Sequence, residues 1–418
     1  MPVADAESVG MSTERLQRID TAMHRHIDTG KIQGAVTALA RRGRVVHFKA
    51  HGLMDVEAKR PMSRDAIFIM MSSTKAILGV AAMMMVEEGL IRPSDPVGRY
   101  IPELADMQVA VLADPADEDI SPLKVDRRNP PAHRLVPAKT PITIHHLLTH
   151  TSGLMSGGLG AAVFMRGVPP RAALFLRGVP PRAPRLKALS GRGKEERGTL
   201  ASYIPTLGEV PLDFQPGSRR AYSGTTGLDV VARIIEIVSG VPFNEFVQSR
   251  ILDPLEMHDT HYNLPPSKAS RRVAIQGRDM SGWFGEMTYF SGSVGLSSTA
   301  KDYLHFQQML LNGGELFGRR LLSPRTVTMM TSDHVSHLPF AGRKGGPGRG
   351  AGYAVGVILD PIAADSRRGA GAFGGGGAFG TVSWSDPAEE IAGVIMLQQP
   401  YGPAISDFEN AVRQAIID

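Results

Sequence analysis

The chain has 418 residues, no cysteine, and 46 Lys and Arg against 41 Asp and Glu, which gives a formal net charge of +5. With 42% hydrophobic and 21% charged residues it can bury one large core or two ordinary ones, which excludes a disordered or fibrous chain. The lack of cysteine excludes a disulfide scaffold, a thiolate metal site, an iron–sulfur cluster and a cysteine nucleophile. Any nucleophile must therefore be an oxygen or an amine.

The sequence predicts neither an export signal nor a membrane-spanning segment. Residues 1–7 lack the basic flank and apolar run of a secretory signal. The longest apolar stretch, residues 76–86, is 11 residues long, whereas a helix needs about 20 to span a bilayer. We therefore expect no membrane span and a cytoplasmic location.

The first predicted elements are a helix and a strand pair. Ser12 is the expected N-cap and Gly30 the expected stop of a helix whose apolar residues recur at helical spacing, namely Leu16, Ile19, Met23 and Ile27. Two runs with strand character follow at 35–40 and 44–51. Gly43 lies between them and supplies the glycine that a tight hairpin needs.

A second helix is predicted over residues 72–88, and it is apolar almost all round, so it should lie in the core. The pattern of residues from about 105 to 280 predicts helices and irregular loops. For the C-terminal part we expect strands that lie between two helices in the sequence. The central helices are expected at 144–149, 227–239 and 243–251; the C-terminal elements are a helix at 300–311, strands at 353–359, 380–384 and 391–398, and a helix from about Ser406. The order predicts an α/β sandwich in which both chain ends build one antiparallel sheet.

The positive charge is concentrated in a Pro/Arg-rich segment at about 164–197. Between Arg166 and Arg197 there are nine basic and two acidic residues, so this stretch carries +7 and the rest of the chain −2. It contains a direct repeat, F-M-R-G-V-P-P-R-A from Phe164 and F-L-R-G-V-P-P-R-A from Phe175. Because no helix-turn-helix or aromatic-interleaved basic pattern accompanies it, we interpret it as a solvated loop insertion and expect no nucleic-acid partner.

Ser72 and Lys75 form a Ser-x-x-Lys pattern at the start of the apolar helix. Residues three apart share a helix face, so the Lys75 ammonium can reach the Ser72 hydroxyl. A lysine at the head of a core helix should be desolvated, which lowers its pKa and makes it a usable base at neutral pH. The pattern alone is also typical of an ordinary N-terminal serine beside a snorkelling lysine, and the apolar context favours a nucleophile and its base.

Two further motifs accompany this pair: Tyr222-Ser223-Gly224 just before a predicted helix, and the glycine-rich stretch 373–381 leading into a strand. Together with Ser72 and Lys75 they resemble the serine β-lactamase and penicillin-binding-protein superfamily, and most closely the family VIII carboxylesterases, relatives of the class C β-lactamases. The stretches 89–97, 144–154 and 295–303 carry the same likeness. It covers most of the chain apart from roughly 106–140 and 155–205.

The resemblance implies a β-lactamase-like fold, an antiparallel sheet flanked by helices with a large, mostly helical inserted domain. Residues 1–105 and 281–418 would form the sheet domain, and 106–280 the inserted domain. Ser72 would be the nucleophile, and Lys75 with Tyr222 the pair that takes its proton and returns one to the leaving group. The backbone N–H groups of Ser72 and Ala378 would form the oxyanion hole, with Gly375, Gly376 and Gly377 lining the substrate site.

Two positions depart from the class C pattern. Gly224 stands where those enzymes have Asn, and Gly375 stands where they have a Lys that holds a substrate carboxylate. Without that cation the pocket favours neutral acyl esters over β-lactams or peptide C-termini. The related esterases often have Trp or His at the Gly375 position, so this site should be wider, and four consecutive glycines should leave a flexible strand edge.

These observations predict a serine hydrolase that cleaves short-chain carboxylic acyl esters through an acyl-enzyme on Ser72, with possible weak β-lactam hydrolysis. The alternatives are an amidase, aminopeptidase or acyltransferase on the same residues, or a catalytically silent binding protein whose basic loop docks to an anionic partner. No metal or organic cofactor is expected. His146 and His150 lie four residues apart, but the glutamate of a His-Glu-x-x-His zinc motif is missing, so they favour packing roles.

Overall fold

The computed structural model describes residues 1–114, 125–126, 129–164, 198–275, 287–341 and 346–418. Within these residues the main sheet has eight strands in the order β12-β13-β14-β15-β16-β1-β2-β3, and its strand pairs are antiparallel. The strands are β1 (Gly34–Arg41), β2 (Arg44–Asp55), β3 (Arg60–Pro61), β12 (Arg349–Ala351), β13 (Gly356–Ile358), β14 (Phe373–Gly376), β15 (Thr381–Asp386) and β16 (Ile391–Met396). β1 pairs with β16, so both ends of the chain build one sheet.

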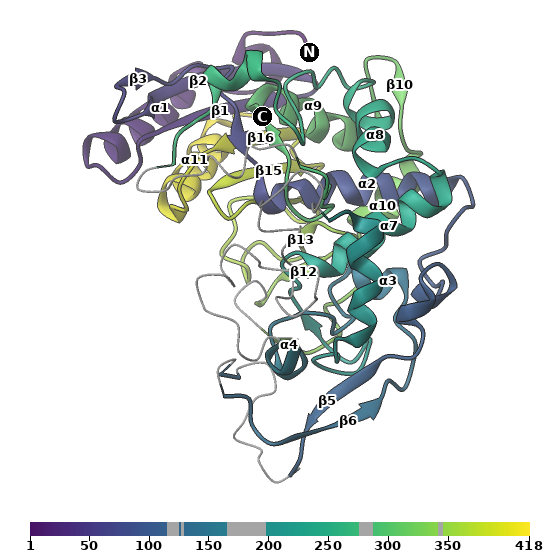
Figure 1. The fold of residues 1–418 in the computed structure, drawn as a ribbon. Helices are drawn as coiled ribbons and strands as arrows, with labels where there is room; N and C mark the ends of the chain where they lie inside the picture. Colours follow the sequence, from purple (N-terminus) through teal and green to yellow (C-terminus); the bar gives the residue numbers. More distant parts are fainter. Residues whose placement is uncertain (115–124, 127–128, 165–197, 276–286, 342–345) are drawn as a thin grey trace.

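Helices cover both faces of this sheet (Figure 1). The terminal helices α1 (Thr13–Asp28) and α11 (Gly402–Ala415) pack together on one face, where Trp384 meets Phe408 edge to face with ring centroids 5.5 Å apart. On the other face α9 (Ala300–Leu311) packs against β1, β15 and β16. The apolar helix α2 (Thr74–Glu87) lies in the larger core on this second side and is buried over most of its length.

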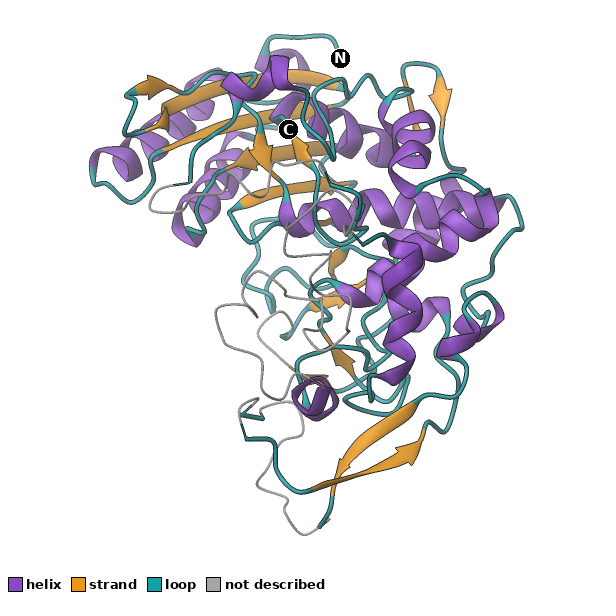
Figure 2. Ribbon diagram, viewed as in Figure 1, coloured by secondary structure: helices purple, strands orange, loops and turns teal. Residues whose placement is uncertain are grey.

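The rest of the described chain extends from α2 as a second mass of short helices and loops (Figure 2). α7 (Thr226–Ser239) packs on α2, on α3 (Ile144–Leu148) and on α8 (Phe243–Val247). A hairpin of β5 (Gln108–Leu112) and β6 (His133–Pro137) lies at the far end. The remaining elements are α4 (Leu159–Phe164), α6 (Leu200–Tyr203), α10 (Pro324–Thr331), β4 (Phe68–Ile69), β7 (Arg220–Ala221), β8 (Ser297–Ser298), β9 (Glu315–Leu316), β10 (Arg319–Arg320) and β11 (Phe340–Ala341).

Most predicted elements are present, with shifted ends. Ser12 caps α1 by accepting a hydrogen bond from the Arg15 N–H, as expected. The C-terminal helix begins at Gly402, four residues before the predicted Ser406, because Pro403 is tolerated in a first helical turn. The helix predicted at 243–251 changes to a π turn (Gln248–Leu252) after α8.

One prediction was wrong. The region from 106 to 140, predicted without strands, contains the β5–β6 hairpin, whose apolar and polar residues do not alternate strictly along the two strands. The glycine run is only partly inside the sheet: β13 pairs with β14 at Phe373 and Gly374, whereas Gly375 and Gly376 pair with β15 alone. A Cβ at Gly374 would lie 2.2 Å from the Ser383 carbonyl oxygen, so close backbone approach requires glycine at this position.

The division into domains at 105 and 280 stays a prediction. The basic segment and its repeat lie outside the described residues, apart from Phe164 at the end of α4. In the described part of the chain, no helix has both the length and the apolar character needed to cross a bilayer.

Candidate active site

Ser72 lies on a tight turn that leads into α2. Residues Met71–Ser73 form a 3-10 turn, one turn type that commonly begins an α-helix, so α2 itself starts two residues later than predicted. Met71 adopts a left-handed φ of 47°, a conformation that is costly for a side chain other than glycine and is often found at functional sites. The Tyr303 hydroxyl of α9 donates a hydrogen bond to the Ser73 carbonyl, which holds this turn against α9.

Lys75 is buried, with only 4% of its surface exposed, and its ammonium is surrounded by oxygen acceptors. Nζ donates to the Ser72 Oγ at 3.3 Å, to the Gly224 carbonyl at 2.6 Å and to the Ser293 carbonyl at 2.9 Å. The two carbonyls hold the ammonium in place because a buried charge needs polar partners. The arrangement directs one N–H of Lys75 at the Ser72 hydroxyl.

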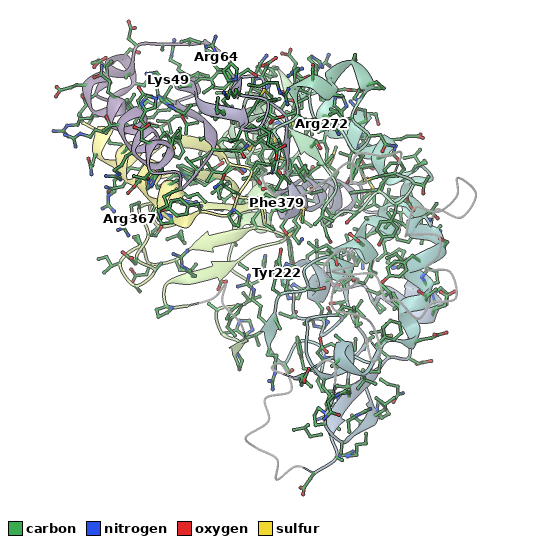
Figure 3. All side chains as sticks on the ribbon, turned by 60° about the vertical axis from the view of Figure 1, so that its left-hand side comes forward. Lys49, Arg64, Tyr222, Arg272, Arg367 and Phe379 are labelled. Atoms are coloured by element: carbon green, nitrogen blue, oxygen red, sulfur yellow. The ribbon has the colours of Figure 1, made fainter. Side chains whose placement is uncertain are left out.

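Tyr222 reaches the same oxygen from the other side of the site. Its hydroxyl lies 2.9 Å from Ser72 Oγ, and its ring lies 5.3 Å from Lys75 Nζ. Tyr222 follows β7, which is held by β11 and by the Ala221 N–H bond to the His150 carbonyl. The His150 ring packs on the Tyr222 ring with centroids 4.7 Å apart. Figure 3 shows Tyr222 in the middle of the molecule, below Phe379.

The turn between β14 and β15 lies against the turn that carries Ser72. A Cβ at Gly377 would lie 2.1 Å from the Met70 carbonyl oxygen and 2.5 Å from Thr381 Oγ1, so glycine is needed for this approach. Thr381 Oγ1 bonds both the Met70 carbonyl, at 3.1 Å, and Ser73 Oγ, at 3.0 Å. Ala378 follows on this turn and is exposed. The predicted oxyanion residues Ser72 and Ala378 thus lie on two adjoining turns.

Gly375 and Gly376 occupy the end of β14 next to this turn. A Cβ at Gly375 would have nothing within 4 Å, and the residue is exposed, so the position is open. A Cβ at Gly376 would lie 2.9 Å from both the Thr381 carbonyl oxygen and Val382 Cγ2. A side chain at Gly375 could therefore project freely.

Asp229 of α7, which no sequence motif pointed to, supports Lys75. Its buried carboxylate accepts hydrogen bonds from the Ser293 N–H at 3.0 Å, the Ser291 hydroxyl at 2.7 Å and the Tyr289 hydroxyl at 2.9 Å. Burial raises the pKa of Asp229, while these bonds and the Lys75 charge oppose the rise. Through Ser293 the carboxylate positions the carbonyl that holds Lys75. The sequence signal that could have identified Asp229 is a lone aspartate among the apolar residues of α7.

His146 and His150 point to different partners. His146 Nδ1 accepts the Thr143 N–H at 3.2 Å and closes the cap of α3, whereas the His150 ring packs on Tyr222. Each histidine therefore has a packing or capping contact of its own. His150 adopts a left-handed φ of 61°, which turns the chain from α3 toward the tyrosine.

Comparisons with known proteins agree with this architecture. The chain is 32% identical over 391 residues to Protein Rv1367c of Mycobacterium tuberculosis (strain ATCC 25618 / H37Rv), covering 89% of this chain and 87% of that protein. It is 27% identical to Esterase EstB of Burkholderia gladioli, covering 96% and 94%. The solved structure of EstCE1, described as a hydrolase with promiscuous acyltransferase activity, superimposes with a TM-score of 0.71 at 24% identity, over 96% of this chain and 99% of that one.

These likenesses confirm the predicted β-lactamase-like fold and the resemblance to the serine β-lactamase superfamily. A family model described as Beta-lactamase matches residues 19–416, nearly the whole chain, and the chain therefore belongs to the beta-lactamase family.

Proposed function

We propose that this protein is a serine carboxylesterase that cleaves short-chain acyl esters through an acyl-enzyme on Ser72. The observation that carries the proposal is the convergence of two side chains on one hydroxyl: Tyr222 OH at 2.9 Å and Lys75 Nζ at 3.3 Å from Ser72 Oγ. In this state both groups donate to Ser72 Oγ, and either one, once deprotonated, is close enough to take the Ser72 proton. The name of the relative EstB supports an ester as substrate.

In the proposed reaction Ser72 Oγ attacks the ester carbonyl carbon, and the Lys75 and Tyr222 pair takes its proton. The tetrahedral oxygen accepts hydrogen bonds from the N–H groups of Ser72 and Ala378, and a single donor of this kind contributes about 3 kcal/mol to transition-state stabilisation. The pair returns the proton to the leaving alcohol as the ester C–O bond breaks. Water then attacks the acyl-enzyme by the reverse sequence and releases the acid.

The substrate preference rests on the open position at Gly375. No side chain there supplies a cation for a substrate carboxylate, so we propose that neutral acyl esters are preferred to β-lactams. The flanking glycines Gly376 and Gly377 would form the backbone wall of the acyl pocket. The preference for short acyl groups is part of the proposal, and the assay below tests it directly.

The test compares hydrolysis of p-nitrophenyl acetate, butyrate and octanoate with that of nitrocefin. Turnover should fall with acyl length, exceed nitrocefin hydrolysis, and disappear in Ser72→Ala. A fluorophosphonate should label the intact protein once, and peptide mass spectrometry should place the label on Ser72.

Ser73→Ala is the matched control because Ser73 is the neighbouring serine and its hydroxyl faces Thr381. It should still be labelled on Ser72. Ester turnover that survives Ser72→Ala would refute the nucleophile. Faster nitrocefin hydrolysis than acetate hydrolysis would refute the ester preference, and acyl transfer to an added alcohol in preference to water would replace the hydrolase by an acyltransferase.

A further inference from the structure

A cluster of nitrogen and oxygen donors lies between α1 and the sheet. Asp20 and His24 are four residues apart on α1 and so share a helix face. His47 and His51 point to one face of β2, because strand residues an even number apart share a face. α1 packs against β2, and the exposed His24 ring lies 5.8 Å from that of His51 in an edge-to-face arrangement.

The donor atoms of this cluster are close together. Asp20, His47 and His51 each offer one atom, and these three atoms lie within 4.8 Å of one another. His51 Nε2 is 4.0 Å from Asp20 Oδ1. The Thr37 hydroxyl of β1 lies between the imidazoles, 2.8 Å from His47 Nε2 and 3.0 Å from His51 Nε2. The two histidines are 6% and 4% exposed.

Asp20 Oδ1 is buried and has no hydrogen-bond donor in the described part of the chain. The Thr37 hydroxyl can donate to one Nε2 and accept from the other, and neither of its contacts reaches Asp20. A buried carboxylate oxygen without a donor costs free energy. A cation in this position would satisfy it.

Metal ions bind the neutral form of imidazole, through a ring nitrogen that carries no proton. Both rings are buried, and burial disfavours the charged imidazolium form. With both Nε2 atoms used as ligands, each ring would carry its proton on Nδ1.

We propose that Asp20, His47 and His51 bind a divalent transition-metal ion, Zn²⁺ being the expected one, with His24 as the fourth ligand. Two or three imidazoles and a carboxylate form a donor set that suits Zn²⁺. The site joins α1 to β2 and shares no residue with the candidate active site. The ion would act on stability, because it binds the folded arrangement of two elements and not the unfolded chain.

Lys49 would compete with a metal ion for Asp20. Its Nζ lies 2.5 Å from Asp20 Oδ2, so the ammonium neutralises the carboxylate that would ligate the ion. Figure 3 labels Lys49 beside α1. Lys49→Met should free both oxygens and remove a repelling charge, so it should bind metal more tightly than the wild type. A purely structural ion pair predicts no such gain.

The experiment titrates the full-length, chelator-treated protein with Co²⁺, followed by competition with Zn²⁺. We expect one ion per chain, intense visible d–d bands from low-symmetry coordination, and a higher melting temperature with Zn²⁺. His51→Gln and Asp20→Asn should each weaken binding by more than about tenfold, since outer-shell changes alone cost that much. His258→Gln removes an exposed histidine outside the cluster and should bind like the wild type.

No saturable 1:1 binding at micromolar metal would overturn the site, as would equal affinities of the wild type and His51→Gln. Circular dichroism of each variant in chelator checks the fold. If His51→Gln does not fold, Asp20→Asn and Lys49→Met decide the question by their opposite effects on affinity. Because the readout is metal binding, its failure leaves the proposed esterase untouched.

Discussion

Replacing Gly377 by Ala should separate the two turns that carry the proposed oxyanion-hole residues Ser72 and Ala378. The new Cβ would lie 2.1 Å from the Met70 carbonyl oxygen, and Cβ contacts under 3.0 Å are essentially never found, so one turn must move by at least about 0.9 Å. The obstacle is backbone on one side and the hydrogen-bonded Thr381 hydroxyl on the other. A misplacement of about 1 Å costs a rate factor on the order of 100.

The assay is p-nitrophenyl acetate hydrolysis, in which kcat should fall about 100-fold. KM should change little, because the displaced Ala378 N–H is proposed to stabilise the transition state rather than the bound ester. Gly402→Ala is the matched control: the residue begins α11, outside the candidate site, and its Cβ would have nothing within 4 Å. It should keep wild-type kcat. Circular dichroism and thermal melting verify that both variants are folded. Wild-type kcat in folded Gly377→Ala would refute the close approach of the turns as a catalytic requirement.

Three further predictions concern single side chains. Lys75→Met should remove the ammonium beside Ser72 Oγ and lower kcat by about 100-fold or more in a folded protein, and an undiminished steady-state rate would exclude Lys75 from proton transfer. Asp229→Asn should weaken its bond to the Ser293 N–H and lower kcat by roughly 10-fold to 100-fold; a change confined to KM would contradict a positioning role. Burial lowers the pKa of His305 from 6.5 to about 4, so the unfolded chain takes up a proton between these values before the folded one does. The free energy of unfolding should therefore fall by up to about 3 kcal/mol as pH drops from 6.5 to 4, and urea denaturation of His305→Gln should show a correspondingly flatter pH profile.

The sequence predicts those parts of the site that depend on local geometry. Ser72 and Lys75 are three residues apart at a helix start, so their contact follows from helical spacing. Tyr222 joins them from 150 residues away, and only its resemblance to a family motif pointed to it. Asp229 could not be placed, because its contact with the Ser293 N–H depends on how α7 packs against the loop before β8.

The sheet was predicted in outline from alternating apolar runs, while details of its glycine-rich strand were not. Glycine has no side chain to show a period of two, so Phe373–Gly376 gives no strand signal, and its pairing with β13 and β15 is a property of the assembled sheet. The β5–β6 hairpin was missed for a similar reason. Its strands pair with each other, and their residues show no regular alternation of buried and exposed positions that a sequence pattern could reveal.

The pairing of β1 with β16 also constrains how the molecule can form. Val36 lies opposite Met396, a separation of 360 residues. The backbone groups on that edge of β1 therefore have no β16 partner until residues 391–396 have left the ribosome. The same holds for α1, whose neighbour α11 follows β16 in the chain. Contacts of such high contact order form slowly and leave apolar strands exposed in the meantime. Nascent chains stalled before β16 should accordingly be recognised by chaperones and cut by proteases, whereas released chains close the sheet in a late, cooperative step.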